Sequence, residues 1–162
     1  MSDQDPSVSK QDLTPAERVR ELLEHVNEAL ELDAEVEIVD DGDRVRGVLH
    51  GEDMGLFIGR HGQTIDAVQH LAFKVAARGE SPPPKVEVDA AGYRDRRRQA
   101  LERQADQAAA DALRSSRPVA LDAMSATERK VVHEYLKDRG DVETYSEGTE
   151  PDRHLVVAPL RG

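Results

Sequence analysis

Four consecutive residues, Gly59, Arg60, His61 and Gly62, have the clearest chemical potential in the chain. Two glycines allow a tight turn and remove side chains that would hold a ligand away from the backbone. Arg60 carries a permanent charge on a fork of donors suited to phosphate, and His61 can donate a hydrogen bond. An amphipathic helix is predicted to begin directly afterwards, at Gln63, and a helix N-terminus favours anions. These features favour an anion-binding loop, and the alternative on the four residues alone is a simple turn between helices.

A second group of candidates lies on a later predicted helix. Arg129 and His133 are four residues apart and therefore share one helix face, with apolar residues on the other side. Lys137 continues the same line, and an exposed row of Arg, His and Lys could contact phosphates; spacing alone favours an ordinary solvated face. A weaker candidate with the same alternative is the one dense basic run, which consists of Arg94, Arg96, Arg97 and Arg98.

The elements around the glycine loop are predicted from capping signals and hydrophobic periodicity. Thr14 and Glu17 form a capping box around Pro15, which suits the first position of a helix. The predicted order is a helix over 15–32, strands over 35–38 and 44–50, a short helical stretch over 52–58, a helix over 63–78 and a strand over 85–89. The buried stripe predicted for the helix after the loop is Ile65, Val68, Leu71, Ala72 and Val75.

The elements around Arg129 and His133 follow in the second half. A long helix over 93–115 has an alanine-rich stripe, and Pro118 ends it. A short extended piece over 119–121 precedes a helix over 126–139, for which Ser125 and Glu128 predict a second capping box. Strands are expected over 142–146 and 153–158. We predict three parts: a disordered segment over 1–14, one domain over 15–90 and another over 91–162.

Composition limits the chemistry that the chain can perform. The 162 residues include no Cys and 3% aromatics, and the net charge is −11. No disulfide, thiol nucleophile or Cys-bound metal is therefore possible, and a platform of stacking aromatics is disfavoured. The charge is −6 over residues 1–33, −5 over 34–89 and zero over 90–162. The net charge thus argues against long-range attraction to nucleic acid but leaves local contacts possible.

The string from Ile58 to Ile65, IGRHGQTI, resembles the IGxxGxxI signature of KH domains, whose GxxG loop clamps the backbone of about four nucleotides. The predicted order of elements is similar to the type II, prokaryotic KH arrangement, and the resemblance covers 15–89. It implies a three-stranded sheet with helices on one face. It further implies that the sugar-phosphate backbone is held by Gly59, Arg60, His61 and Gly62, over an apolar floor of Ile58 and Ile65.

The stretch from Met124 to His133 resembles the core of the small R-three-H domain, which is associated with single-stranded nucleic acid. The segments 93–97 and 144–148 and the residue Arg153 are also similar to that family, so the resemblance covers 91–159. It implies a small α/β domain after the KH domain, and an α+β class for the whole chain. In this reading Arg129 and His133 contact phosphate or base, and the track is extended by Arg94, Arg97 and Arg98.

A KH domain followed by an R-three-H domain is similar to the bacterial Jag family, also called KhpB. The resemblance implies a cytoplasmic, non-enzymatic binder of single-stranded RNA, and single-stranded DNA is a further possibility. It also implies a post-transcriptional regulator or RNA chaperone linked to cell elongation, division and shape, with a second small KH protein as a partner. The chain resembles a short form without the N-terminal Jag domain.

Two other classes of function can be compared with the sequence. The main alternative is an acidic protein–protein interaction scaffold whose KH surface mediates dimerisation or partner binding. An enzyme is disfavoured because His61, His133 and His154 stand in no recognisable ligand or triad spacing. We expect no catalytic residue, metal, cofactor or membrane insertion, and the oligomeric state stays open.

Overall fold

A computed structural model describes residues 13–160 of the chain. The first twelve residues of the segment predicted to be disordered lie outside this range. The chain divides into two compact units, with the boundary between Tyr93 and Arg94.

The first unit begins with α1 (Pro15–Ala29), whose predicted capping box is present. The Thr14 backbone N–H donates to Glu17 Oε2 at 2.7 Å, and the Glu17 N–H donates to Thr14 Oγ1 at 3.2 Å. The first of these bonds is the main reason why the pKa of the Glu17 carboxyl lies below its ordinary value. The helix ends three residues earlier than predicted, because Glu31 adopts a left-handed conformation with φ 53°.

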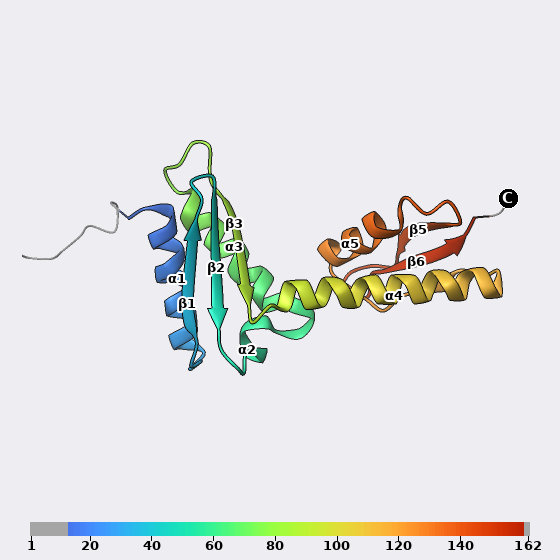
Figure 1. The fold of residues 1–162 in the computed structure, drawn as a ribbon, viewed down its shortest axis with the longest axis horizontal. Helices are drawn as coiled ribbons and strands as arrows, with labels where there is room; N and C mark the ends of the chain where they lie inside the picture. The colour runs from blue at the N-terminus through green and yellow to red at the C-terminus, as the bar shows by residue number, and fades with distance from the viewer. Residues whose placement is uncertain (1–12, 161–162) are drawn as a thin grey trace, which may run out of the picture. The chain divides into compact units, whose positions relative to one another are not determined.

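A three-stranded sheet in the order β1-β2-β3 lies beside the helices. Strands β1 (Glu35–Asp40) and β2 (Arg44–His50) form an antiparallel hairpin, whereas β3 (Lys85–Ala90) runs parallel to β2. The parallel pairing requires a crossover, and the helices between β2 and β3 provide it. The helices α1 and α3 lie against one face of this sheet, as the type II KH resemblance implies (Figure 1).

The crossover contains the glycine loop. It runs through α2 (Gly55–Ile58), a single 3₁₀ turn η1 (Arg60–Gly62) and α3 (Gln63–Ala77). Two residues of the predicted stripe on α3 are not buried: Leu71 is 51% exposed and Val75 is only half-buried, whereas Ala76 is buried in the core. The buried positions 65, 68, 72 and 76 form a stripe narrower than the periodicity indicated.

The second unit has its own sheet and core. Its elements are α4 (Tyr93–Ser115), β4 (Val119–Ala120), α5 (Ala126–Leu136), β5 (Val142–Glu147) and β6 (His154–Pro159). The strands are antiparallel in the order β4-β6-β5, so β5 is an edge strand beside α5. The predicted alanine-rich stripe of α4 is confirmed, and residues from both helices and the sheet share one core. The two units together make the predicted α+β class.

Candidate nucleic-acid interface

The glycine loop has an unusual backbone conformation. Gly59, His61 and Gly62 all have positive φ, at 73°, 55° and 74°. Glycine adopts such angles without penalty, but His61 does so at a cost of about 1–3 kcal/mol. The loop is closed at both ends, since the Gly59 N–H donates to the Gly55 carbonyl at 2.8 Å and the Gly62 N–H to the Gly59 carbonyl at 3.3 Å.

The two glycines are also required by close packing within the chain. A Cβ atom on Gly59 would collide with the Thr64 side chain and lie 2.9 Å from its backbone nitrogen. A Cβ atom on Gly62 would lie 2.6 Å from the Tyr93 hydroxyl oxygen. Each glycine is therefore required both by its positive φ and by a close neighbour within the chain.

The loop presents cationic and hydrogen-bonding groups to solvent. The side chains of Arg60 and His61 are exposed on its outer side. Helix α3 starts immediately afterwards, and Gly62 at its N-cap has no side chain with which to cap the first N–H groups. Asp66 lies in the first turn of α3 and opposes an anion there. A single phosphate is the kind of anion that this combination can hold.

The apolar surface beside the loop differs from the predicted floor. Ile58 is half-buried: it packs against the core and leaves part of its side chain accessible beside the loop. Ile65 has 0% exposure and belongs to the core under α3, so it supports the loop from within and its predicted place under the bases is not available. Ile65 lies at the third position of α3, where the inward face is packed against the sheet.

In the second unit, Arg129 is not part of an exposed row. The residue is 8% exposed, because its guanidinium is held on two sides. Nη1 donates to the Met124 carbonyl at 2.6 Å, and Nη2 pairs with Glu150 Oε1 at 2.9 Å. The prediction of exposure was therefore wrong for Arg129. Arg129 lines a pocket that also contains His133, and one of the N–H groups of its guanidinium is already bound to the Glu150 carboxylate.

His133 lies one turn further along α5 and is exposed, as predicted. Its Nδ1 and the Oγ1 of Thr144 on β5 are 2.5 Å apart and share a hydrogen bond. A pocket of ≈ 390 Å³ brings the two predicted residues together with groups from the neighbouring strands. Its lining is Ala126, Arg129, Lys130, His133, Thr144, Tyr145, Ser146, Arg153 and Leu155.

This pocket contains residues that the candidate set from the sequence omits. Lys130 and Arg153 add two cations, and Thr144 and Ser146 add two hydroxyl groups. The segment 144–148 and Arg153 had a signal in the resemblance to the R-three-H tail, but the pairing of β5 with β6 is needed to bring them beside α5. A site with several donors around a small hollow suits a phosphate and part of one nucleotide.

Two arginines of the basic run at the start of α4, Arg97 and Arg98, form ion pairs within the second unit. Arg97 Nε donates to Glu128 Oε1 at 2.6 Å, and this bond takes the carboxylate that the second capping box was predicted to use. The Ser125 hydroxyl does accept from the Glu128 N–H at 3.2 Å. Arg98 pairs with Asp95 and Glu102, which raises its pKa above the ordinary value. Arg94 is half-buried and makes an interaction of its own.

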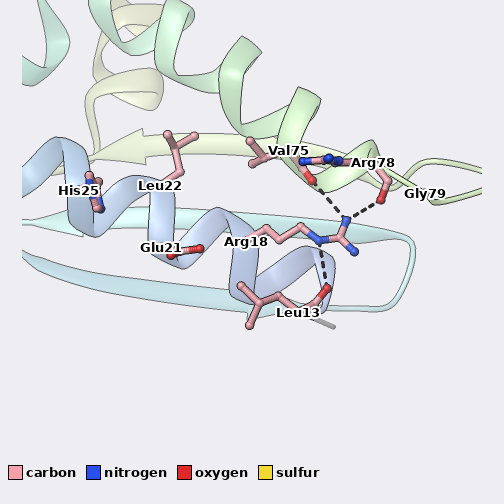
Figure 2. A pocket seen from close by; sticks show the side chains of 8 residues that line it. All are labelled: Leu13, Arg18, Glu21, Leu22, His25, Val75, Arg78 and Gly79. Carbon is pink, nitrogen blue, oxygen red and sulfur yellow. Dashed lines mark hydrogen bonds between the residues drawn. The ribbon is translucent and has the colours of Figure 1, made fainter. Parts of the chain in front are cut away.

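The first unit also has a larger hollow of ≈ 790 Å³ between α1 and the end of α3. Figure 2 shows Arg18 extending from α1 to this end, where its Nη1 donates to the carbonyls of Val75 at 3.3 Å and Arg78 at 2.7 Å. A cation at the last carbonyls of a helix stabilises it. The guanidinium of Arg18 is thus used to terminate α3 and to tie it to α1.

Comparison with protein families assigns each half of the chain. Residues 16–89 match the KH domain of KhpA and KhpB, and residues 99–159 match the R-three-H domain. Both are nucleic-acid-binding domains and neither is catalytic, so the fold and the glycine loop define a protein with a KH domain and an R-three-H domain in tandem. The part of the chain that the structure describes has no cluster of three or more His, Asp or Glu side chains arranged for a metal, and none of its helices is long and apolar enough to cross a membrane.

Several curated relatives are similar along most of the chain. The RNA-binding protein KhpB of Clostridium symbiosum is 34% identical over 155 residues, which is 94% of this chain and 70% of the relative. That of Bacillus subtilis is 30% identical over 151 residues, 92% of this chain and 73% of the relative. The Lactiplantibacillus plantarum protein is 39% identical over 104 residues, which is 64% of this chain and 32% of the relative. The chain belongs to the KhpB family.

Proposed function

We propose that this protein binds single-stranded RNA through two sites: the glycine loop of its first domain, and the pocket lined by Arg129, His133 and Thr144 in its second, called the α5 pocket below. The observation that carries the proposal is the loop itself, in which Gly59, His61 and Gly62 all have positive φ in front of a helix N-terminus without a side-chain cap. Curated relatives along most of the chain are named RNA-binding proteins, which supports RNA as the ligand.

The glycine loop is proposed to hold the sugar-phosphate backbone. Arg60 and His61 contribute charge and hydrogen bonds, while the bare backbone of Gly59 and Gly62 lets a phosphate approach closely. Ile58 provides the apolar surface for a base, so RNA binding at the loop does not depend on stacking against aromatic side chains. Because the surrounding domain is acidic, affinity depends on these few groups instead of a broad positive field.

The α5 pocket is proposed to take a second phosphate. Arg129 and His133 are its central members, and Lys130 and Arg153 surround them. A phosphate that binds Arg129 has to displace the Glu150 carboxylate from its guanidinium, and this competition weakens phosphate binding in the pocket. Two weak sites on one chain still give useful affinity, because binding at the first raises the effective concentration of RNA at the second.

A non-catalytic RNA binder of this kind fits a post-transcriptional regulator or RNA chaperone in the cytoplasm, linked to cell elongation and division. A second small KH protein is proposed as a partner. Arg94 and Arg98 are proposed as peripheral RNA contacts. Arg97 is not, because its Nε donates to the Glu128 carboxylate. Single-stranded DNA is a competing ligand to be tested beside RNA.

The test is a fluorescence anisotropy titration of the full chain with single-stranded RNA, duplex RNA and single-stranded DNA at several salt concentrations. We expect single-stranded RNA to bind best, with log K falling by about 0.7 per phosphate contact for each log unit of salt. Absence of binding at low salt would refute the proposal. A pull-down that keeps its partners after RNase treatment would favour the acidic scaffold instead.

A further inference from the structure

One aromatic side chain lies directly against the glycine loop. Tyr93 is the last residue of the first unit and also the first residue of α4. Its ring is half-buried and packs against the core of that unit. A Cβ atom on Gly62 would lie 2.6 Å from the Tyr93 hydroxyl oxygen, 3.2 Å from Cε1 and 3.3 Å from Cζ. The edge of the ring therefore covers the α-carbon of the second loop glycine.

This contact has a physical consequence for the loop. Gly62 is buried although it has no side chain, so its surroundings must come from neighbours such as Tyr93. The hydrogen bond that closes the loop, from the Gly62 N–H to the Gly59 carbonyl, is long at 3.3 Å. A long bond and strained His61 need packing to hold them, since left-handed conformations persist only where the surroundings determine them.

We propose that Tyr93 is a positioning residue of the RNA-binding loop. Its ring holds Gly62 in the left-handed conformation before RNA arrives, and so lowers the ordering cost of binding. The inference rests on the proposed function of the loop. It means that the loop of the KH domain is completed by a residue beyond β3, at the point where the helix of the next domain begins.

Three variants of the full chain separate the ring from the hydroxyl. Tyr93→Phe keeps the ring, Tyr93→Ala removes it, and Tyr135→Ala is a matched control that removes an aromatic ring from α5. We expect hydrogen exchange of the Gly62 amide without RNA to accelerate several-fold in Tyr93→Ala only. The affinity for single-stranded RNA should fall about two- to ten-fold in that variant and stay within about two-fold in the other two.

A spectroscopic measurement tests the same contact without a substitution at Tyr93. The chain has three tyrosines, so 3-fluorotyrosine labelling gives three ¹⁹F signals; the variants Tyr135→Phe and Tyr145→Phe assign two of them, and the third belongs to Tyr93. We expect single-stranded RNA to shift the Tyr93 signal, and to leave it in place when Arg60→Asp and His61→Asp are present. If Tyr93→Ala does not fold, Tyr93→Leu takes its place with the same expectations.

The outcomes distinguish this inference from the proposed function. Unchanged exchange at Gly62 in Tyr93→Ala would overturn the positioning role whatever the affinity. If the charge reversal at Arg60 and His61 abolishes binding while Tyr93→Ala does not weaken it, the inference fails alone. If neither change weakens binding, the assignment of the loop fails and the inference fails with it.

Discussion

Replacing both Arg60 and His61 with aspartate inverts the charge of the glycine loop while leaving its two glycines in place. Both side chains are exposed, so neither substitution removes a core contact. Asparagine and aspartate are among the residues that tolerate left-handed angles best, so aspartate can replace His61 at φ 55°. The fold is therefore expected to survive, and far-UV circular dichroism should be unchanged.

The size of the effect follows from exposure. Two unit charges about 4 Å apart interact by about 1 kcal/mol when water surrounds them. Changing Arg60 to aspartate turns one such attraction into a repulsion, and aspartate at position 61 adds another repulsion to the same phosphates. The sum is about 3 kcal/mol, which lowers affinity at the loop by about a hundredfold.

The assay is anisotropy of labelled single-stranded RNA with the full chain at low salt, in the wild type and the double variant. A conservative control, Arg60→Lys, keeps the charge and should lose only a few-fold. The dependence of log K on log salt should also become shallower by about 0.7 for the lost contact. Equal affinities for the wild type and the double variant would refute the assignment of the loop, provided that circular dichroism shows both to be folded.

Three further changes probe the second pocket and the first helix. Arg129→Ala combined with His133→Ala should lower RNA affinity several-fold without loss of the fold, and unfolding in circular dichroism would show the pair to be structural. Glu150→Gln removes the charge that pairs with Arg129, so affinity should rise by up to about five-fold in the same titration, and a decrease would contradict the competition. Thr14→Ala removes the cap of α1 and should lower the free energy of unfolding by about 1 kcal/mol in urea, where no change would show the cap to be dispensable. By NMR, the pKa of the Glu17 carboxyl should lie below the ordinary glutamate value, and an ordinary value would refute the capping geometry. The contribution of this carboxylate to stability is therefore present above the unfolded-state pKa and is lost as the pH falls through the folded-state pKa.

The order of elements and the glycine loop could be predicted because their signals are local. The Thr14 capping box, the glycines and the alternation of strand residues each act over a few positions. The width of a buried face is not local, however. Leu71 has the correct period for the core of α3, and it is exposed because the neighbouring elements do not extend over its position.

Whether a basic side chain is free or paired with an acid depends on residues distant in the sequence. Arg129 is covered by Glu150, which lies 21 residues later in the loop before β6, and Arg97 is held by Glu128, 31 residues away. Spacing along a helix predicts which side chains share a face, but not which acids come to meet them. The packing of Tyr93 on Gly62 had no sequence signal, because it depends on how the chain returns after β3.

RNA is proposed to contact both the glycine loop and the α5 pocket. Ultraviolet crosslinking of the full chain to single-stranded RNA, followed by mass spectrometry of the modified peptides, tests this proposal most directly. We expect crosslinks within residues 58–65 and within 126–133 or 144–153, with the first set lost in the Arg60→Asp, His61→Asp variant. Crosslinks confined to other segments, or a pattern unchanged by that variant, would contradict it.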